Sequence, residues 1–351
     1  MALSADVTGA RDDAREIVIV IGPGRSGTST VAGALCHCGL EVPGRAIRGN
    51  ATNPAGFYEP RWVVDFHRRI LDDTQVSSFD TMPDAQERVA AAAAKPVVRD
   101  TLRTWLGERL LEQPRLVVKD PRIVWFRDLW VDVARELGAE PGFVTMVRHP
   151  AEVAASRQKA YDPDGPELRD NEIRRIAGWI NVTLTAERAS SGSPRAFVKY
   201  TDLVADWRGA LTRVERGLGL RLEPDISAAE HPVDGFIDSS LRRVNVDWSA
   251  VAVPQHLRDL GERVWQTMSE LAGNEDTDER RAEVDRLRAE YLEVTTDAVA
   301  LVRPAIRRQT STARRRARRQ LREKLAEESR TVEGASSGLG AAWRRLTGGK
   351  A

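Results

Sequence analysis

The sequence predicts an α/β fold with a central, mostly parallel sheet between two layers of helices. Three observations support this prediction: short β-branched apolar runs, longer helix-compatible segments between them, and polar or basic residues directly after each run. Strands that alternate with helical segments are typical of βαβ units, in which neighbouring strands run parallel. The expected strands lie at residues 17–21, 116–118, 143–147 and 196–198, and the expected helices at 61–72, 86–111, 129–137 and 172–189.

The first expected strand leads into a glycine-rich turn and then a helix start, in the stretch IVIVIGPGRSGTST at residues 17–30. Converging backbone N–H groups and a helix N-terminus form an anion site, so this pattern predicts a P-loop-like fold. Gly22 and Gly27 have the spacing of a nucleotide triphosphatase loop, but Thr28 stands where the phosphate-bridging lysine is required. The basic residue is instead Arg25, inside the loop, with hydroxyl groups at Ser26, Ser29 and Thr30 close by.

Polar and basic residues also follow the other expected strands. Lys119 and Asp120 follow the second strand, Arg148 the third, and Lys199 and Tyr200 the fourth. Ligands of open parallel sheets bind beyond the carboxyl ends of the strands. We therefore expect one crevice to collect these side chains.

Three motifs occur in an order that resembles the PAPS-dependent sulfotransferase family, where PAPS is 3′-phosphoadenosine 5′-phosphosulfate. PGRSGTS at 23–29 is similar to its 5′-phosphosulfate loop, VRHPAEVAASR at 147–157 to its 3′-phosphate motif, and VKYTDLV at 198–204 to a third conserved strand end. NPAGFYE at 53–59 and VVKDPR at 117–122 resemble the bacterial and tyrosylprotein-like branch. The resemblance covers about residues 16–215.

The resemblance implies a site for the PAPS donor and no metal. Arg148 and Ser156 would bind the 3′-phosphate, Tyr200 would flank the adenine, with an apolar core role as the alternative, and Arg243 would close over the 3′-phosphate. The R-K-G motif that usually closes this side in the cytosolic branch of the family is absent from the chain. The 5′-phosphosulfate would be held by Pro23, Gly24, Arg25, Ser26, Gly27, Thr28 and Ser29.

Sulfuryl transfer should proceed by in-line displacement, with catalysis by positioning and charge stabilisation. Arg25 and Lys119 are the expected cations at the leaving oxygen. The general base is Glu59 by resemblance, and His67 and Asp65 are the alternatives. Helix residues 59–69 and the aromatic side chains of Phe57, Tyr58 and Trp62 are expected to line the acceptor pocket, with a core role for the aromatic side chains as the equal alternative.

The favoured acceptor is a hydroxyl of a carbohydrate, a glycolipid or a small metabolite. Two alternative functions stay open at this point. One is a P-loop kinase of a small metabolite, which would need Arg25 or Lys119 to replace the absent lysine. The other is a non-catalytic scaffold that binds the spent cofactor or another nucleotide.

Four regions are expected along the chain. These are a flexible N-terminus at 1–15, the sulfotransferase α/β domain at 16–250, a C-terminal helical extension at 251–332, and a flexible tail at 333–351. The extension is expected to break near Gly273 and Pro304.

The basic segment, defined as residues 303–324, contains ten basic side chains and one acidic side chain, whereas the whole chain has a net charge of +1. A basic amphipathic helix is typical of contact with an anionic membrane surface or a protein partner. Pairing with the acidic remainder of the chain is the alternative, and no motif indicates sequence-specific nucleic-acid binding. Without a secretory signal or an apolar span, we expect a cytoplasmic protein, peripheral at the inner face of the membrane if the segment binds lipid.

Overall fold

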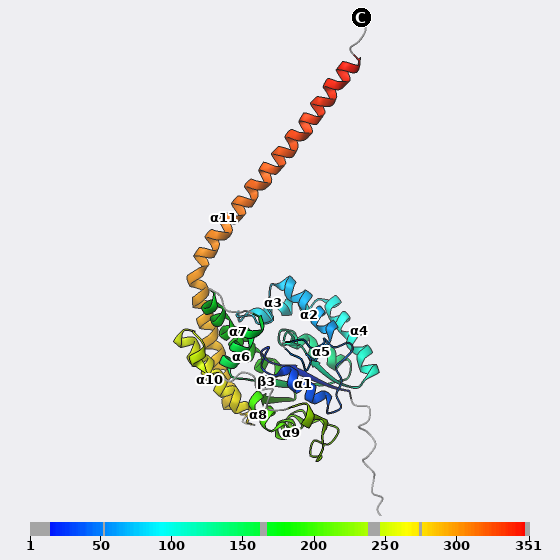
Figure 1. Cartoon of the computed structure of the whole chain (residues 1–351), viewed down its shortest axis with the longest axis vertical. Helices are drawn as coiled ribbons and strands as arrows, with labels where there is room; N and C mark the ends of the chain where they lie inside the picture. The colour runs from blue at the N-terminus through cyan, green and yellow to red at the C-terminus, as the bar shows by residue number, and fades with distance from the viewer. Residues whose placement is uncertain (1–14, 52, 162–166, 238–245, 274–275, 348–351) are drawn as a thin grey trace, which may run out of the picture. The chain divides into compact units, whose positions relative to one another are not determined.

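A four-stranded parallel sheet forms the centre of the protein (Figure 1). The computed structural model describes residues 15–51, 53–161, 167–237, 246–273 and 276–347, and only the backbone of Tyr161 and of residues 325–347. The strands have the order β2-β1-β3-β4. They are β1 (Glu16–Ile21), β2 (Arg115–Lys119), β3 (Pro141–Val147) and β4 (Arg195–Lys199). All four coincide with expected strands, so the predicted fold class is confirmed.

The alternation of side chains along β1 separates two hydrophobic cores. Ile17, Ile19 and Ile21 face one core, while Val18 and Val20 face the other, as the period of two in a strand requires. Every one of these five side chains is at least 98% buried. A strand buried on both faces is therefore apolar along its whole length, which is the pattern of a covered parallel sheet.

Helices cover both faces of the sheet. On the Val18 side lie α1 (Thr28–Cys36), α8 (Tyr200–Ala205) and α9 (Trp207–Leu218), with the short 3₁₀ helix η2 (Pro232–Gly235). On the Ile19 side lie α2 (Arg61–Thr74), α3 (Ala85–Ala93), α4 (Pro96–Glu112), η1 (Ile123–Phe126), α5 (Arg127–Glu136), α6 (Pro150–Tyr161), α7 (Leu168–Ser190), η4 (Trp248–Ala250), α10 (Gln255–Ala272) and the first turns of α11 (Asp278–Thr347).

One expected helix is two helices. The sequence predicts a continuous helix at 86–111, but α3 ends at Ala93 and α4 begins at Pro96. Proline has no backbone N–H and a fixed φ, so it suits the first position of a helix and cannot continue the preceding one. The prediction of one helix was therefore wrong, because Pro96 starts a second helix.

The C-terminal helix is longer than the sequence predicts. A break occurs after α10, at Gly273, but α11 continues through Pro304 and on to Thr347. The proline removes one backbone hydrogen bond, to the carbonyl of Ala300, which is exposed and therefore open to water. The helix thus passes through residues 333–347, which were expected to form part of a flexible tail. None of the helices in the described residues is both long enough and apolar enough to cross a bilayer.

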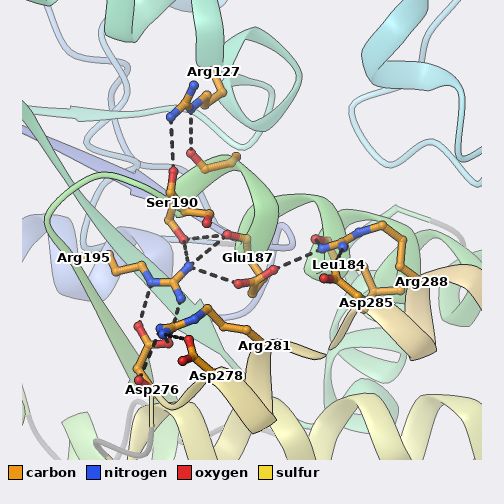
Figure 2. A network of polar contacts seen from close by, with 12 residues as sticks. Arg127, Leu184, Glu187, Ser190, Arg195, Asp276, Asp278, Arg281, Asp285 and Arg288 are labelled. Atoms are coloured by element: carbon orange, nitrogen blue, oxygen red, sulfur yellow. Dashed lines mark hydrogen bonds and ion pairs between the residues drawn. The ribbon is translucent and has the colours of Figure 1, made fainter. Parts of the chain in front are cut away.

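The chain divides into two compact units, Met1–Leu292 and Glu293–Ala351. The first turns of α11 belong to the first unit, and a buried carboxylate, that of Glu187 at the end of α7, fastens them (Figure 2). Arg195 at the start of β4 and Arg288 of α11 each contact one Glu187 oxygen at 3.0 Å. Asp276 holds both Arg195 and Arg281, at 2.8 and 2.6 Å, just before α11 begins. The network therefore ties α7, β4 and α11 together.

Candidate active site

The phosphate loop follows β1, at the point where the order of the strands reverses. β1 has β2 on one side and β3 on the other, and such a switch point opens a crevice at the carboxyl ends of the strands. The loop runs from Gly22 to Gly27, which stands at the N-cap of α1. Ser26 is fully buried and donates a hydrogen bond from its hydroxyl to the carbonyl of Pro23 at 2.6 Å, which closes the turn.

Two features of the loop favour the binding of an anion. No side chain caps α1, so within the described residues its first N–H groups have no side-chain acceptor. Arg25 and Gly27 both have positive φ, of 78° and 94°, a conformation that turns the backbone sharply around the loop. A Cβ on Gly27 would lie 2.3 Å from Cδ2 of Tyr200, so only glycine fits there. The predicted loop residues 23–29 therefore form one compact cradle at the start of α1.

Arg25, Arg148 and Ser156 meet beside this loop, although they come from three different segments. Arg25 donates from Nε to the hydroxyl of Ser156 at 3.1 Å, and Arg148 donates from Nη1 to the backbone carbonyl of Arg25, also at 3.1 Å. Ser156 reaches the loop because it lies in α6, which starts directly after β3. Two guanidinium groups and a hydroxyl at one position form a suitable site for a phosphate.

A carboxylate that sequence reasoning missed holds Arg148 in place. Glu152 accepts from Nε of Arg148 at 2.8 Å, and both side chains are more than 90% buried. Glu152 lies four residues after Arg148 across the end of β3 and the first turn of α6, and that spacing was the available signal. The guanidinium also lies 4.4 Å above the ring of Tyr200. Arg148 is therefore held on two sides, with its Nη1 directed at the loop.

Tyr200 belongs to the hydrophobic core on the Val18 side of the sheet. Its side chain is buried, packs against Gly27 and supports the guanidinium of Arg148. This position matches the core role that the sequence left as the alternative to adenine contact. Arg243, the expected closing residue, lies outside the described residues.

A second cluster lies on the other side of the α1 N-terminus and joins Lys119, Glu59 and Ser29. The ammonium of Lys119 contacts Glu59 Oε1 at 2.6 Å and donates to the hydroxyl of Ser29 at 3.2 Å. The side chain of Lys119 is 3% exposed and that of Glu59 is 12% exposed. Ser29 in turn donates to the carbonyl of Phe57 at 3.2 Å. A cation and a carboxylate thus stand together next to the phosphate loop.

Local backbone geometry carries Glu59 to this position. The carbonyl of Glu59 accepts from the N–H of Ile47 at 2.8 Å, and Ala46 and Pro60 form an antiparallel bridge. Tyr58, directly before it, has a positive φ of 55°, which costs energy for a bulky residue and marks a sharp turn. Helix α2 begins just after, at Arg61.

His67 occupies a different environment from the one expected of a general base. Its side chain is fully buried, its Nδ1 lies 2.8 Å from Asp120 Oδ2, and its Nε2 accepts from the indole N–H of Trp130 at 2.9 Å. Both ring nitrogens are therefore engaged, and the pattern requires the neutral ring with its proton on Nδ1. Burial lowers the pKa of His67 further, against the opposing effect of Asp120.

Asp120 is the fully buried acid that follows Lys119. Burial alone would raise its pKa, but the hydrogen bond from His67 and the charge of Arg122 outweigh burial and lower it to about 2. Arg122 contacts the other oxygen of Asp120 at 2.7 Å. The carboxylate thus braces the strand end that carries Lys119, and His67 positions the carboxylate. Asp65, the other alternative base, is half-buried on α2.

The aromatic residues expected around an acceptor are packed against one another. Trp62 stacks between Phe66 and Trp105, with ring centroids 4.9 and 4.4 Å apart, and Tyr58 meets Phe236 edge to face. These contacts favour, for Tyr58 and Trp62, the core role that the sequence left open beside the acceptor pocket. The hydrophobic gain of stacking inside the core outweighs exposure of such large rings.

A cavity of about 250 Å³ adjoins the Arg148 cluster. Its lining includes Arg148, His149, Thr201, Val246 and Trp265. His149 is packed edge to face against Trp248 and Trp265, and burial lowers its pKa although Glu262 opposes this shift. The lining also includes the carboxylates of Glu152 and Asp247 beside the guanidinium of Arg148. The rings of His149 and Trp265 suit an aromatic base, and Arg148 suits a phosphate attached to it. Among the described residues no group of three or more metal-ligating side chains occurs.

Comparisons with known proteins point to one family. A family model described as "Sulfotransferase family" matches residues 17–224, more than half of the chain. A sulfotransferase domain from the Synechococcus PCC 7002 olefin synthase is 19% identical, with a TM-score of 0.41 over 73% of this chain and 95% of that one. A sulfotransferase domain from the curacin biosynthetic pathway is 15% identical, with a TM-score of 0.39 over 73% and 98%. No curated protein matches the chain significantly.

Proposed function

Since the chain belongs to the sulfotransferase family, as its three motifs predict, we propose that it transfers the sulfuryl group of PAPS to a hydroxyl group of an acceptor. One observation carries the choice of donor. The start of α1 stands between two clusters that each offer a cationic side chain, Arg25 with Arg148 on one side and the ion pair of Lys119 with Glu59 on the other. A donor with a phosphate at each end of its ribose requires two such sites around one loop.

The residues present fit this donor. The uncapped start of α1 and the glycines of the loop would receive the 5′-phosphosulfate, and Arg148 with Ser156 would receive the 3′-phosphate. The cavity at His149 and Trp265 would accept the adenine. PAPS supplies an activated sulfur whose bond to the 5′-phosphate oxygen breaks in the reaction.

Glu59 and Lys119 would have different roles at the 5′-phosphosulfate, where the reaction takes place. A bond forms between the acceptor oxygen and sulfur, the proton of the acceptor hydroxyl passes to the Glu59 carboxylate, and negative charge grows on the departing phosphate oxygen. Lys119 lies between Glu59 and Ser29, so its ammonium can compensate that charge while the carboxylate takes the proton. Glu59 suits the base better than His67, because the nitrogens of His67 are both engaged inside the core.

The donor is tested by calorimetric titration with the spent cofactor, 3′-phosphoadenosine 5′-phosphate (PAP), and in parallel with ATP and magnesium. Arg148 and Glu152 form a buried ion pair, so replacing Arg148 alone would take the cation away from a buried carboxylate. The informative variant is therefore Arg148→Gln with Glu152→Gln. Losing two charge-assisted hydrogen bonds should weaken PAP by about 10²–10⁴-fold.

Arg103→Gln is the matched control, because Arg103 is exposed on α4 and pairs only at the surface with Asp100. This control should bind PAP as the wild type does. Equal binding of PAP and magnesium-ATP, unaffected by the Arg148 double variant, would overturn the proposed donor and favour a kinase.

We further propose that the basic segment, 303–324, binds anionic lipid at a membrane surface. All 22 of its side chains are exposed, and Ile306 and Leu321 give it an apolar stripe, exposed by 53% and 59%. Each base near an anionic surface contributes roughly 1 kcal/mol. Sedimentation with vesicles containing phosphatidylserine should be salt-sensitive and should weaken in an Arg314→Gln, Arg315→Gln, Arg316→Gln variant. Equal sedimentation with neutral vesicles would contradict the proposal.

A further inference from the structure

Two consecutive residues at the end of β2, Lys119 and Asp120, connect the strand with α2. Lys119 contacts Glu59, which lies just before the helix begins, at 2.6 Å. Asp120 contacts His67, in the second turn of the helix, at 2.8 Å. The position of the cation beside the phosphate loop is therefore linked to a second contact, deeper in the core, to which the proposed reaction assigns no role.

The Asp120 carboxylate has partners on both of its oxygens. One oxygen accepts from Nδ1 of His67, and the other accepts from the backbone N–H of Arg122 at 3.1 Å and from its Nη1 at 2.7 Å. His67 is held in turn by the indole N–H of Trp130 at 2.9 Å and by stacking on Phe126, with ring centroids 4.2 Å apart. Hydrogen bonds are directional, so this chain of contacts fixes the end of β2 against α2 and α5.

Stability alone does not account for polar side chains at this position. The side chains of His67 and Asp120 are 0% exposed, so neither can contact a substrate. Burying a carboxylate costs desolvation even when it is paired, and well-packed apolar side chains of the same volume are often equally stable or more stable. Hydrogen-bonded groups impose a fixed orientation, which apolar packing does not. The chain of Trp130, His67 and Asp120 is therefore suited to hold a neighbouring group in one place.

The neighbouring group that needs such support is Lys119. Lysine has a flexible four-carbon stem, so its ammonium stays in one position only if its surroundings impose it. The side chain is 3% exposed, and the ammonium lies 3.2 Å from the hydroxyl of Ser29, in the first turn of α1. The proposed donor would carry its 5′-phosphate there. A displacement of about 1 Å at a reacting group can lower a rate about 10²-fold, so the position of the strand end matters.

We propose that Asp120 and His67 are positioning residues for the donor, which hold the end of β2 so that the ammonium of Lys119 reaches the 5′-phosphate. This inference rests on the proposed function and adds two residues that act on the donor only through Lys119. Their effect on binding should therefore disappear when Lys119 is absent. PAP is a suitable probe, because it retains the 5′-phosphate oxygen that separates from sulfur in the proposed reaction.

The first measurement compares the PAP affinity of the full-length protein with that of an Asp120→Asn variant by calorimetry. Asparagine has the same size but only one acceptor oxygen, so it cannot serve both His67 and Arg122. Removing a negative charge near an anion site should by itself strengthen the binding of an anion, whereas a displaced Lys119 should weaken it. We expect PAP to bind about tenfold more weakly, which corresponds to the partial loss of one charge-assisted contact.

The second measurement is a double-mutant cycle. Asp120→Asn is also introduced into a protein that carries Lys119→Met and Glu59→Gln, in which there is no ammonium left to position and no carboxylate left without its cation. This background should bind PAP about tenfold or more weakly than the wild type, because the contact of Lys119 is lost. Adding Asp120→Asn should weaken the binding no further.

His67 tests the chain of contacts from its other end. His67→Leu removes both hydrogen bonds and should weaken PAP about tenfold, whereas His67→Asn, whose amide N–H can replace the Nδ1 donor, should retain most of the affinity. The matched control is His231→Asn. His231 is 5% exposed and has both ring nitrogens engaged, but it packs against Trp207 on the Val18 side of the sheet. This control should lose stability and bind PAP as the wild type does.

Unchanged or tighter binding of PAP by Asp120→Asn would overturn the inference. Equal weakening in the two backgrounds would also overturn it, because the effect would then not pass through Lys119. The same loss of affinity in His231→Asn would show that lower stability is sufficient, with the same consequence. Absence of PAP binding by the wild type would overturn the proposed function and, with it, the positioning role of these residues.

Discussion

The buried pair of Lys119 and Glu59 allows the most direct test of the site, because stability and chemistry can be separated there. The two charges lie 2.6 Å apart, with side chains 3% and 12% exposed. Lys119→Met removes the cation and leaves the carboxylate in a place that water hardly reaches. Removing one partner of a buried ion pair costs about 3–5 kcal/mol, and the residual exposure of Glu59 favours the lower end. We expect about 3 kcal/mol, which is roughly a hundredfold change in the unfolding equilibrium constant.

The companion variant is Lys119→Met with Glu59→Gln. Without either charge the site resembles an ordinary buried contact, so most of the lost stability should return, to within about 1 kcal/mol of the wild type. Sulfuryl transfer should not return, since the cation and the carboxylate to which we assign it are both gone. Unfolding in guanidinium chloride, followed by tryptophan fluorescence and extrapolated to water, measures each free energy.

Arg103→Met is the control for this series, because Arg103 and Asp100 form an exposed pair at 3.0 Å, with side chains 52% and 62% exposed. Its unfolding free energy should match that of the wild type within error. If Lys119→Met costs no more than an exposed pair does, about 1 kcal/mol or less, the two charges are solvated and the reasoning fails.

Three further predictions address the loop, the core and α11. Because the pKa of His67 is lowered in the folded protein, the unfolded chain takes up a proton at a higher pH than the folded protein does. The free energy of unfolding should therefore be complete above the ordinary histidine pKa of about 6.5 and should fall as the pH drops below that value. Denaturant titrations at pH 7.5 and 5.5 should show a smaller pH dependence in a His67→Asn variant, and an equal dependence in both proteins would contradict the prediction. Gly27→Ala places a Cβ 2.3 Å from the Tyr200 ring and should abolish PAP binding in calorimetry. Gly192→Ala is the control, because Gly192 also has positive φ but has open space around it, and this variant should bind PAP as the wild type does. Equal PAP affinity of the two variants would show that the close approach of Gly27 to Tyr200 is unimportant. Glu187→Gln should speed amide hydrogen exchange in the first turns of α11, because two arginines lose their shared carboxylate, and unchanged exchange would refute that role.

The elements that the sequence predicts well are the ones controlled by neighbouring residues. The run from Ile17 to Ile21 is apolar at every position because both faces of a central parallel strand are covered. The loop after it needs positive φ at Gly27, which is a local steric requirement. These features, together with the order of the motifs, were sufficient to predict the fold class and the family.

Which side chains meet in the site depends on residues far apart in the chain, and for the general base the sequence left alternatives open. Glu59 and Lys119 are sixty positions apart, and only the parallel sheet and the turn at Tyr58 bring them together. His67 was an alternative to Glu59 as the base in the sequence, but its burial and its two hydrogen bonds hold both ring nitrogens inside the core.

The charged side chains show most clearly what the sequence predicts and what only the tertiary structure decides. The resemblance of residues 147–157 to the family's 3′-phosphate motif implied that Arg148 and Ser156 belong to one site, and both meet at Arg25. The cavity at His149 is lined by residues from the end of β3, from α8 and from α10, and no pattern in the sequence links them. Backbone propensity and periodicity act over a few residues, so the sequence alone determines the strands, the loop and their order. The environment of a charge depends on everything packed around it, so the partners of Glu59, His67 and Arg148 are decided by the tertiary structure.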